Sequence, residues 1–94
     1  MTEKINDLLR EYKNELNYID DDAKVLELGS KIQILYYIKG YLESANIEIL
    51  SLLEELIDSF EELESQGKNL NIILPKLEVL NYLKGYYQWN NKSN

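Results

Sequence analysis

Carboxylates, lysines and tyrosines are the side chains with which this sequence could do chemistry. The 94 residues include no histidine and no cysteine, and Arg10 is the only arginine. Ser–His and Cys–His nucleophiles, zinc sites and the Glu-x-x-His signature of di-iron bundles all need residues that are missing here. The composition therefore predicts a protein that is not an enzyme and that holds no cofactor and no metal ion.

The densest group of ionisable side chains is an acidic run that contains no basic residue. On a helix, Glu54 and Asp58, and likewise Asp58 and Glu62, form like-charge pairs that each cost roughly a few tenths of a kcal/mol. A metal site would need several carboxylates on the side that faces the core, where the spacing puts Leu53 and Phe60 instead. We interpret the run as a solvated face, or as a face that docks on a basic protein. This acidic face consists of Glu54, Glu55, Asp58, Glu61 and Glu62.

Tyrosines form the second group, because the same pair of them occurs twice at i,i+4 spacing. Tyr37 and Tyr41 make up the first pair, and Tyr82 and Tyr86 make up the second. A tyrosine at the edge of a small core is common, but aromatic residues are also what protein interfaces prefer. The pairs therefore fit either a structural role or a binding role.

The second pair is followed by further aromatic residues. On a helical wheel Trp89 falls about 180° from Leu80, which faces the core. An exposed Trp beside tyrosines is typical of a binding hot spot. We expect the end of this last helix to be the recognition surface, and the matching stretch around Tyr41 to be mainly structural. The predicted partner-binding residues are Tyr82, Tyr86, Tyr87 and Trp89.

The aromatic pairs recur because a longer stretch recurs. KLEVLNYLKGYYQWNN (76–91) lies without a gap over KIQILYYIKGYLESAN (31–46), and LLEELIDSFEELE (52–64) repeats the apolar positions of LLREYKNELNYID (8–20). The repeated unit is a helical hairpin, and two hairpins in tandem pack most simply as an antiparallel four-helix bundle. An α-solenoid fragment is the alternative, but two units are too few for a stable array.

The sequence thus predicts one all-α domain over residues 1–94. The hairpin repeats cover about residues 3–44 and 46–89, and a frayed polar tail follows at 90–94. Apolar spacings of three and four predict helices over about 3–19, 23–44, 46–64 and from 72 or 75 to 84 or beyond.

Local signals predict where these helices begin and end. Thr2 and Asn46 are expected N-caps, and Gly67 is expected at the C′ position. The aspartates 20–22 lack the spacing of a calcium loop, so we expect a turn whose last members cap the second helix.

Two positions inside the repeat suggest further boundaries. Ser30 fits a capping box and the aligned Pro75 suits a first turn, so the main helix of each hairpin is expected to start there. Gly40 and Gly85 point away from the core rows, and we interpret them as C-caps; contact with another chain is the alternative.

Charge and hydropathy limit the partners. Ten basic and seventeen acidic residues give a net charge of −7. Such a chain is repelled by phosphate backbones and anionic lipid, so we expect no direct binding to nucleic acid. No apolar run reaches the roughly 18 residues of a membrane span, and the start MTEKINDLLREYK lacks a signal-peptide pattern. These features predict a cytoplasmic protein with a protein partner, and a homodimer stays open.

The C-terminal half, SANIEILSLLEELIDSFEELESQGKNLNIILPKLEVLNYLKGYY, resembles that of the immunity proteins for enterocin A-type (pediocin-like) bacteriocins. In that family an apolar third helix, a short loop with Gly or Asn and a Leu-Pro-like start lead to a Leu-rich last helix. The resemblance implies an antiparallel four-helix bundle that protects its producer cell. It also implies action at the bacteriocin's membrane receptor, a sugar-phosphotransferase permease, with specificity in the C-terminal half. The acidic balance and the internal duplication depart from the family pattern.

The alternative function belongs to a different class. A soluble acidic adaptor or inhibitor, such as a regulatory or mobile-element protein, would use the acidic face to dock on a basic protein surface.

Overall fold

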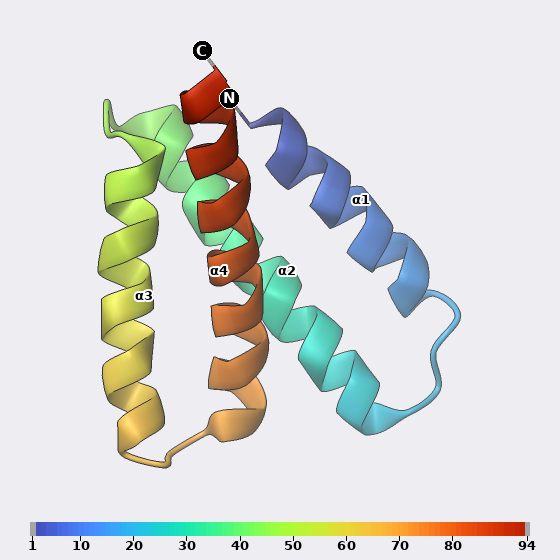
Figure 1. The fold of residues 1–94 in the computed structure, drawn as a ribbon. Helices are drawn as coiled ribbons and strands as arrows, with labels where there is room; N and C mark the ends of the chain where they lie inside the picture. Colours follow the sequence, from blue (N-terminus) through green and yellow to red (C-terminus); the bar gives the residue numbers. More distant parts are fainter. Residues whose placement is uncertain (1, 94) are drawn as a thin grey trace.

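The computed structural model describes the backbone of residues 2–93 and the side chains of residues 2–90. Over this range the chain forms four helices in antiparallel order (Figure 1), which confirms the all-α four-helix bundle. They are α1 (Glu3–Leu16), α2 (Asp22–Ser44), α3 (Ile49–Ser65) and α4 (Leu70–Ser93). α4 lies against α3 and against α2, and α1 lies against α2. α2 and α4, the second helices of the two predicted hairpins, therefore run side by side in the same direction.

The core consists of aliphatic side chains from all four helices. Burial of one Leu or Ile side chain stabilises a fold by roughly 2 kcal/mol, so this cluster is the main source of stability. The most deeply buried side chains are Ile5, Leu35, Ile38, Leu53, Val79, Leu80 and Leu83.

The two copies of the repeat bury most of the same positions. Buried in both are the aligned pairs Ile34/Val79, Leu35/Leu80 and Ile38/Leu83. Exposed in both are Gln33/Glu78, Tyr37/Tyr82, Gly40/Gly85 and Tyr41/Tyr86. The origin of the chain as two tandem hairpin repeats stays a prediction, but equivalent residues meet equivalent environments in α2 and α4.

The ends of the first two helices are largely as predicted. Thr2 takes the predicted N-cap position of α1, although its side chain makes no capping hydrogen bond, and α1 ends at Leu16, three residues early. The side chain of Asp21 accepts a hydrogen bond from the N–H of Ala23 at 3.0 Å, so the predicted cap in the aspartate run is confirmed.

α2 runs without a break through the predicted boundary, so a helix start at Ser30 is wrong. Ser30 is buried, and its Oγ donates a hydrogen bond to the carbonyl of Leu26 at 2.8 Å, a contact made inside helices. The additional turns before it bury Leu28. That burial outweighs the cost of about 1 kcal/mol for Gly29 inside a helix.

The boundaries of α3 are partly as predicted. Glu48, rather than Asn46, takes the N-cap position, and its side chain makes no capping hydrogen bond. At the other end Gly67 has a φ of 72°, and its N–H donates to the carbonyl of Glu64 at 2.9 Å. The predicted C′ role of Gly67 is confirmed, because this left-handed conformation suits a residue without a Cβ.

α4 begins earlier than predicted, and its end at Ser93 falls within the predicted range of residue 84 or beyond. The carbonyl of Asn69 accepts hydrogen bonds from the N–H groups of Ile72 and Ile73, and this places the first helical residue at Leu70. Pro75 is therefore inside the helix, where its missing N–H leaves one backbone bond unmade. The backbone of residues 90–93 is helical, and Asn94 lies outside the described residues, so the frayed tail stays a prediction.

Gly40 and Gly85 both lie inside helices, so their assignment as C-caps is wrong. A Cβ added to either glycine would meet no atom within 4 Å among the described residues. Close packing within this part of the chain therefore does not explain either glycine, and contact with another chain stays a prediction.

Candidate protein-binding surface

Aromatic side chains cover the outer side of α4 in its C-terminal half. Trp89 is 70% exposed and Tyr82 is 49% exposed, and both lie on the opposite side from the buried Leu80. Tyr86 is also exposed, whereas Tyr87 is partly buried against the core. The structure thus brings three of the four predicted residues to the outside and gives Tyr87 a packing role.

The side chain of Lys4, in α1, contacts the rings of Tyr82 and Tyr86. Its Nζ lies 5.3 Å from the ring centroid of Tyr82 and 5.2 Å from that of Tyr86, within the range of cation–π attraction. Hydrogen bonding with Tyr82 raises the pKa of Lys4 above 10.5. The rings of Tyr86 and Tyr87 meet edge to face at 5.1 Å. The start of α1 and the end of α4 therefore order each other.

The exposed aromatic residues of α4 flank a glycine. Tyr82, Gly85 and Trp89 have i, i+3 and i+7 spacing, which lines them up on one side of a helix over about 10 Å. An added Cβ at Gly85 would meet open space. The two exposed rings are therefore separated by bare backbone. We call these three residues, together with Tyr86, the aromatic stripe.

Exposure alone does not separate this stripe from its counterpart in α2. Tyr37 is 50% exposed, as much as the aligned Tyr82, and its ring lies 5.6 Å from that of Tyr41. Where α4 has Trp89, however, α2 has Ser44. The two helices differ in this large aromatic residue and in the cation that Lys4 supplies.

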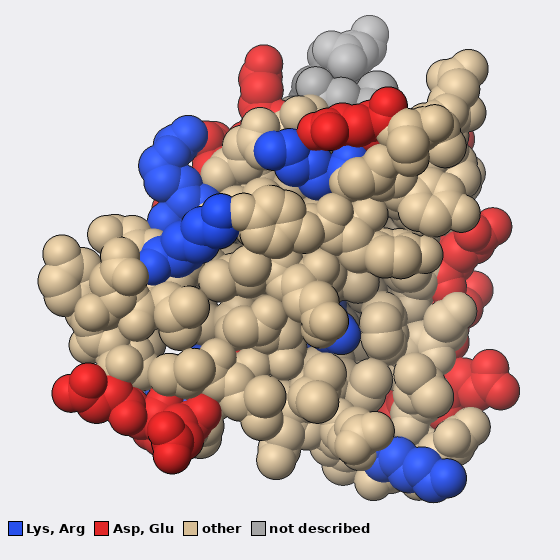
Figure 2. Space-filling view, turned by 180° about the vertical axis from the view of Figure 1, so that it is seen from behind, with Lys and Arg blue, Asp and Glu red and all other residues tan. Residues whose placement is uncertain are grey.

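The acidic face lies on the outside of α3. All five of its carboxylate residues are exposed, and within the described part of the chain none forms an ion pair with a basic side chain. In Figure 2 carboxylates lie along the α3 edge of the molecule, which is on the right in that view, and the centre of the view is largely uncharged. The arrangement fits a solvated face and equally a docking face.

A buried lysine that the sequence analysis missed joins three helices. Lys31 of α2 is only 8% exposed, and its Nζ lies 3.4 Å from Glu78 Oε1 and 3.6 Å from Glu27 Oε1. The ring centroid of Tyr12, in α1, lies 5.3 Å away. Burial lowers the pKa of Lys31, but the attraction of Glu78 and the other neighbours is larger, so the pKa lies above 10.5.

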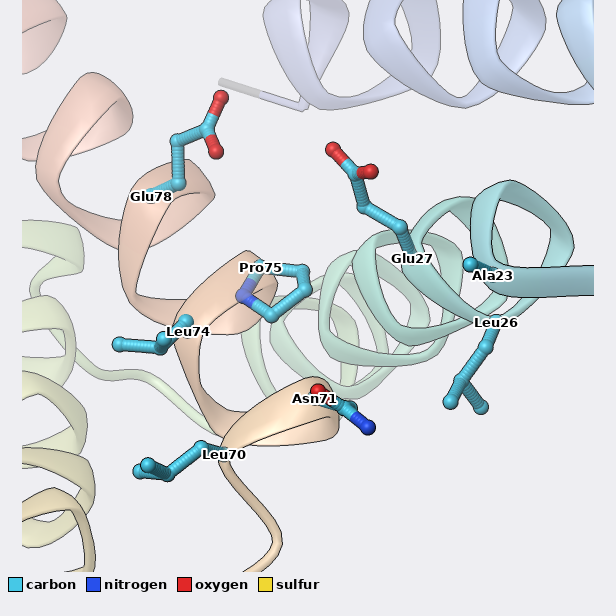
Figure 3. Close-up of a pocket in the computed structure, with 8 residues that line it drawn as sticks. All are labelled: Ala23, Leu26, Glu27, Leu70, Asn71, Leu74, Pro75 and Glu78. Atoms are coloured by element: carbon cyan, nitrogen blue, oxygen red, sulfur yellow. The ribbon is translucent and has the colours of Figure 1, made fainter.

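The two carboxylates also border a groove between α2 and α4. Figure 3 shows Glu27 and Glu78 above it on facing helices, with the ring of Pro75 between them. The groove measures about 360 Å³ and is otherwise lined mainly by apolar residues. Both acids therefore share one cation, Lys31, at the border of this groove.

Two features of the described residues bear on other functions. No three His, Cys, Asp or Glu side chains gather there in a way that could hold a metal ion. Within the same residues, the helices are all too short or too polar to cross a bilayer.

The fold and the surface define an all-α four-helix protein with an exposed aromatic stripe on its last helix. A scan against protein-family models finds no family that matches, and neither curated proteins nor solved structures show a similar protein.

Proposed function

We propose that this protein is a non-enzymatic, protein-binding helical bundle whose aromatic stripe contacts the partner. The observation that carries the proposal is the exposure of Trp89 beside Tyr82, with the bare backbone of Gly85 between them. An exposed Trp near tyrosines is the composition that dominates binding energy at interfaces. A partner residue can approach the α4 backbone at Gly85 and contact a ring on either side.

The biological role we propose is immunity to a pediocin-like bacteriocin. The resemblance noted above lies in the C-terminal half, and the aromatic stripe lies in the same half. In this role the protein acts in the cytoplasm, and its partner is the sugar-phosphotransferase permease that serves as the bacteriocin's receptor. The stripe would recognise the permease or its complex with the bacteriocin.

One observation favours a second candidate, the acidic adaptor or inhibitor. Five exposed carboxylates that form no ion pair with the described part of the chain leave α3 with a strong local negative charge. A basic protein surface would be attracted to this face, and the association would weaken as salt is added.

Site-specific crosslinking tests both candidates in one experiment. A photoreactive phenylalanine derivative is placed at position 89 in one variant and at position 58 in another, and both are expressed in bacteriocin-sensitive cells. The immunity role predicts a crosslink to permease subunits from position 89, together with protection against the bacteriocin. A crosslink to a basic protein from position 58 alone would instead support the adaptor role.

Failure of the immunity proposal is equally clear. Cells that express the unmodified protein at a high level and remain fully sensitive to the pediocin-like bacteriocins tested would contradict that role. A crosslink from position 89 to a protein other than the permease would keep the aromatic stripe as the binding surface and change the partner.

A further inference from the structure

Two grooves of the molecule are built from equivalent residues of the repeat. One is lined by Gln33, Ile34 and Tyr37 of α2, Leu56 and Phe60 of α3, and Lys76 of α4. The other is lined by Glu78, Val79 and Tyr82 of α4, and by Leu8, Glu11 and Tyr12 of α1. Each measures about 330 Å³. The three residues from α2 in the first groove align in the repeat with the three from α4 in the second.

A lysine at the same repeat position is associated with each groove. Lys76 lines the first groove, whereas Lys31 of α2 contacts Glu78 of α4, which lines the second. Exchange of the two copies turns this contact into one between Lys76 of α4 and position 33 of α2. That position holds Gln33, an amide in place of a carboxylate. Lys31 therefore has a carboxylate partner at the aligned position, Glu78, whereas Lys76 has only the amide of Gln33 there.

Lys76 stands in an apolar setting without a counter-ion. Its side chain is partly buried, and its Nζ lies 5.6 Å from the ring centroid of Phe60. No carboxylate of the described residues lies within ion-pair distance of it. Burial is the cause that lowers the pKa of Lys76 below 10.5, and no neighbouring charge opposes it. A partly desolvated cation of this kind gains from any anion that enters the groove.

The neighbours of Lys76 suit a carboxylate attached to an apolar group. The amide of Gln33 and the hydroxyl of Tyr37 can each donate a hydrogen bond, whereas a glutamate at position 33 would repel an incoming anion. Ile34, Leu56 and Phe60 supply apolar walls. Charge complementarity therefore selects the occupant, because Lys76 lines this groove and its other lining residues, Gln33, Ile34, Tyr37, Leu56 and Phe60, carry no charge.

We propose that the groove around Lys76, between α2, α3 and α4, binds the carboxylate of a protein partner. The occupant is an Asp or Glu side chain of the partner, flanked by apolar residues, and it takes the place beside Lys76 that Glu78 takes beside Lys31. The groove does not include Trp89 or the C-terminal end of α4. An experiment can therefore contradict the proposal for this groove without contradicting the proposal for the aromatic stripe.

Peptide titration followed by NMR of the lysine side chains tests the site. The probes are acetylated, amidated Leu-Glu-Leu and its Leu-Gln-Leu counterpart, which differs only in the charge. The Glu peptide is expected to shift the signals of Lys76 and to bind roughly tenfold more tightly than the Gln peptide, because charge-assisted hydrogen bonds are the stronger ones.

Three variants locate the binding. Lys76→Met removes the cation and keeps an apolar stem, so binding of the Glu peptide should fall to the level of the Gln peptide. Gln33→Glu supplies the missing carboxylate from inside the chain and should block the site while the fold is kept. Lys84→Met, a matched loss of one charge on the same helix, should leave binding unchanged.

The remaining outcomes overturn the proposal. Equal affinity for the Glu and Gln peptides would show that the groove does not distinguish a carboxylate from a neutral amide. Binding that survives either Lys76→Met or Gln33→Glu, or that weakens equally in Lys84→Met, would place it elsewhere or assign it to net charge. If inorganic phosphate displaces the Glu peptide at similar concentration, the groove is a general anion site rather than one for an acidic side chain.

Discussion

Lys31 Nζ lies 3.4 Å from Glu78 Oε1, and this contact joins α2 to α4 across 47 positions of sequence. The aligned residues of the other copy are Lys76 and Gln33, which cannot form the same ion pair. The two similar segments, 31–46 and 76–91, are therefore alike in their main buried apolar positions and differ in their charges. That asymmetry has measurable consequences for stability.

Lys31→Met is expected to lower the free energy of unfolding by about 1 kcal/mol at neutral pH, the upper end for an ion pair with an exposed carboxylate. Met preserves the packing of the apolar stem, so the loss reports the charge. The pKa of Lys31 is raised above 10.5 in the folded protein, because the attraction of its neighbours exceeds the lowering effect of burial. Its stabilisation is therefore fully present below pH 10.5 and is lost as the pH rises through the folded-state pKa.

Urea unfolding of both proteins at pH 7 and in alkaline solution measures this difference. The gap between the parent protein and Lys31→Met should close above pH 10.5. Lys76→Met serves as the control with the opposite sign, since burial lowers the pKa of Lys76 and the charge destabilises the fold at neutral pH. A gap for Lys31→Met that stays constant at high pH would show that packing, not charge, is responsible.

The glycines inside α2 and α4 lead to a second prediction. Gly40→Ala and Gly85→Ala should each raise the free energy of unfolding by about 0.5–1 kcal/mol, because Ala loses less backbone entropy in a helix and its Cβ meets open space. Gly85→Ala should nevertheless weaken partner binding, since its methyl group fills the gap in the aromatic stripe. Urea unfolding and the crosslink yield from position 89 measure the two effects.

Gly40→Ala is the matched control for binding, because its helix has no counterpart of Trp89. A crosslink yield that is unchanged in Gly85→Ala would remove the glycine from the binding surface. A loss of stability in either variant would mean that the helix is strained there in a way that open space around the Cβ does not reveal.

Much of the fold could be predicted because its signals are local or repeated. Apolar spacing predicts the four helices, and the recurrence of residues 31–46 at 76–91 predicts that α2 and α4 have equivalent surroundings. The continuation of α2 through Ser30 and of α4 through Pro75 could not be predicted in the same way. Ser occurs both at helix starts and within helices, and Pro within a helix is disfavoured by its own chemistry. For Ser30 the outcome depends on burial of neighbours such as Leu28 in the assembled bundle.

The candidate binding surface also has one part that could be predicted from the sequence and one part that could not. A helical wheel suffices to place Trp89 on the outside, because that depends only on its own helix. The contacts of Lys4 with Tyr82 and of Lys31 with Glu78 join helices that are far apart in the sequence. No spacing rule connects such pairs, and only the packing of the helices brings them together.

The acidic face gives a third prediction. Asp58→Lys combined with Glu61→Lys should raise the free energy of unfolding by roughly a few tenths of a kcal/mol, because it replaces like-charge pairs on α3 with opposite charges. If the face is only solvated, bacteriocin protection and crosslinking from position 89 should not change. If it docks on a basic partner, association should become slower and less sensitive to salt. Unchanged association kinetics with such a partner in this double variant would end the adaptor proposal.

The last prediction compares the two copies of the aromatic pattern. Trp89→Ala should reduce affinity for the partner about fivefold or more, which corresponds to at least about 1 kcal/mol, while the melting temperature barely moves. The reason is that Trp89 is 70% exposed, so its truncation leaves the core intact.

Tyr86→Ala should weaken binding too, but it also removes the contact with Lys4 and so should cost some stability. Tyr41→Ala should do the reverse of Trp89→Ala, since it removes the ring contact with Tyr37 and leaves α4 unchanged. Calorimetric titration with the partner that crosslinking identifies measures the affinity, and thermal unfolding measures the stability. If Trp89→Ala instead unfolds the protein while residual binding persists, Trp89 belongs to the folding core and the aromatic stripe is not the binding surface.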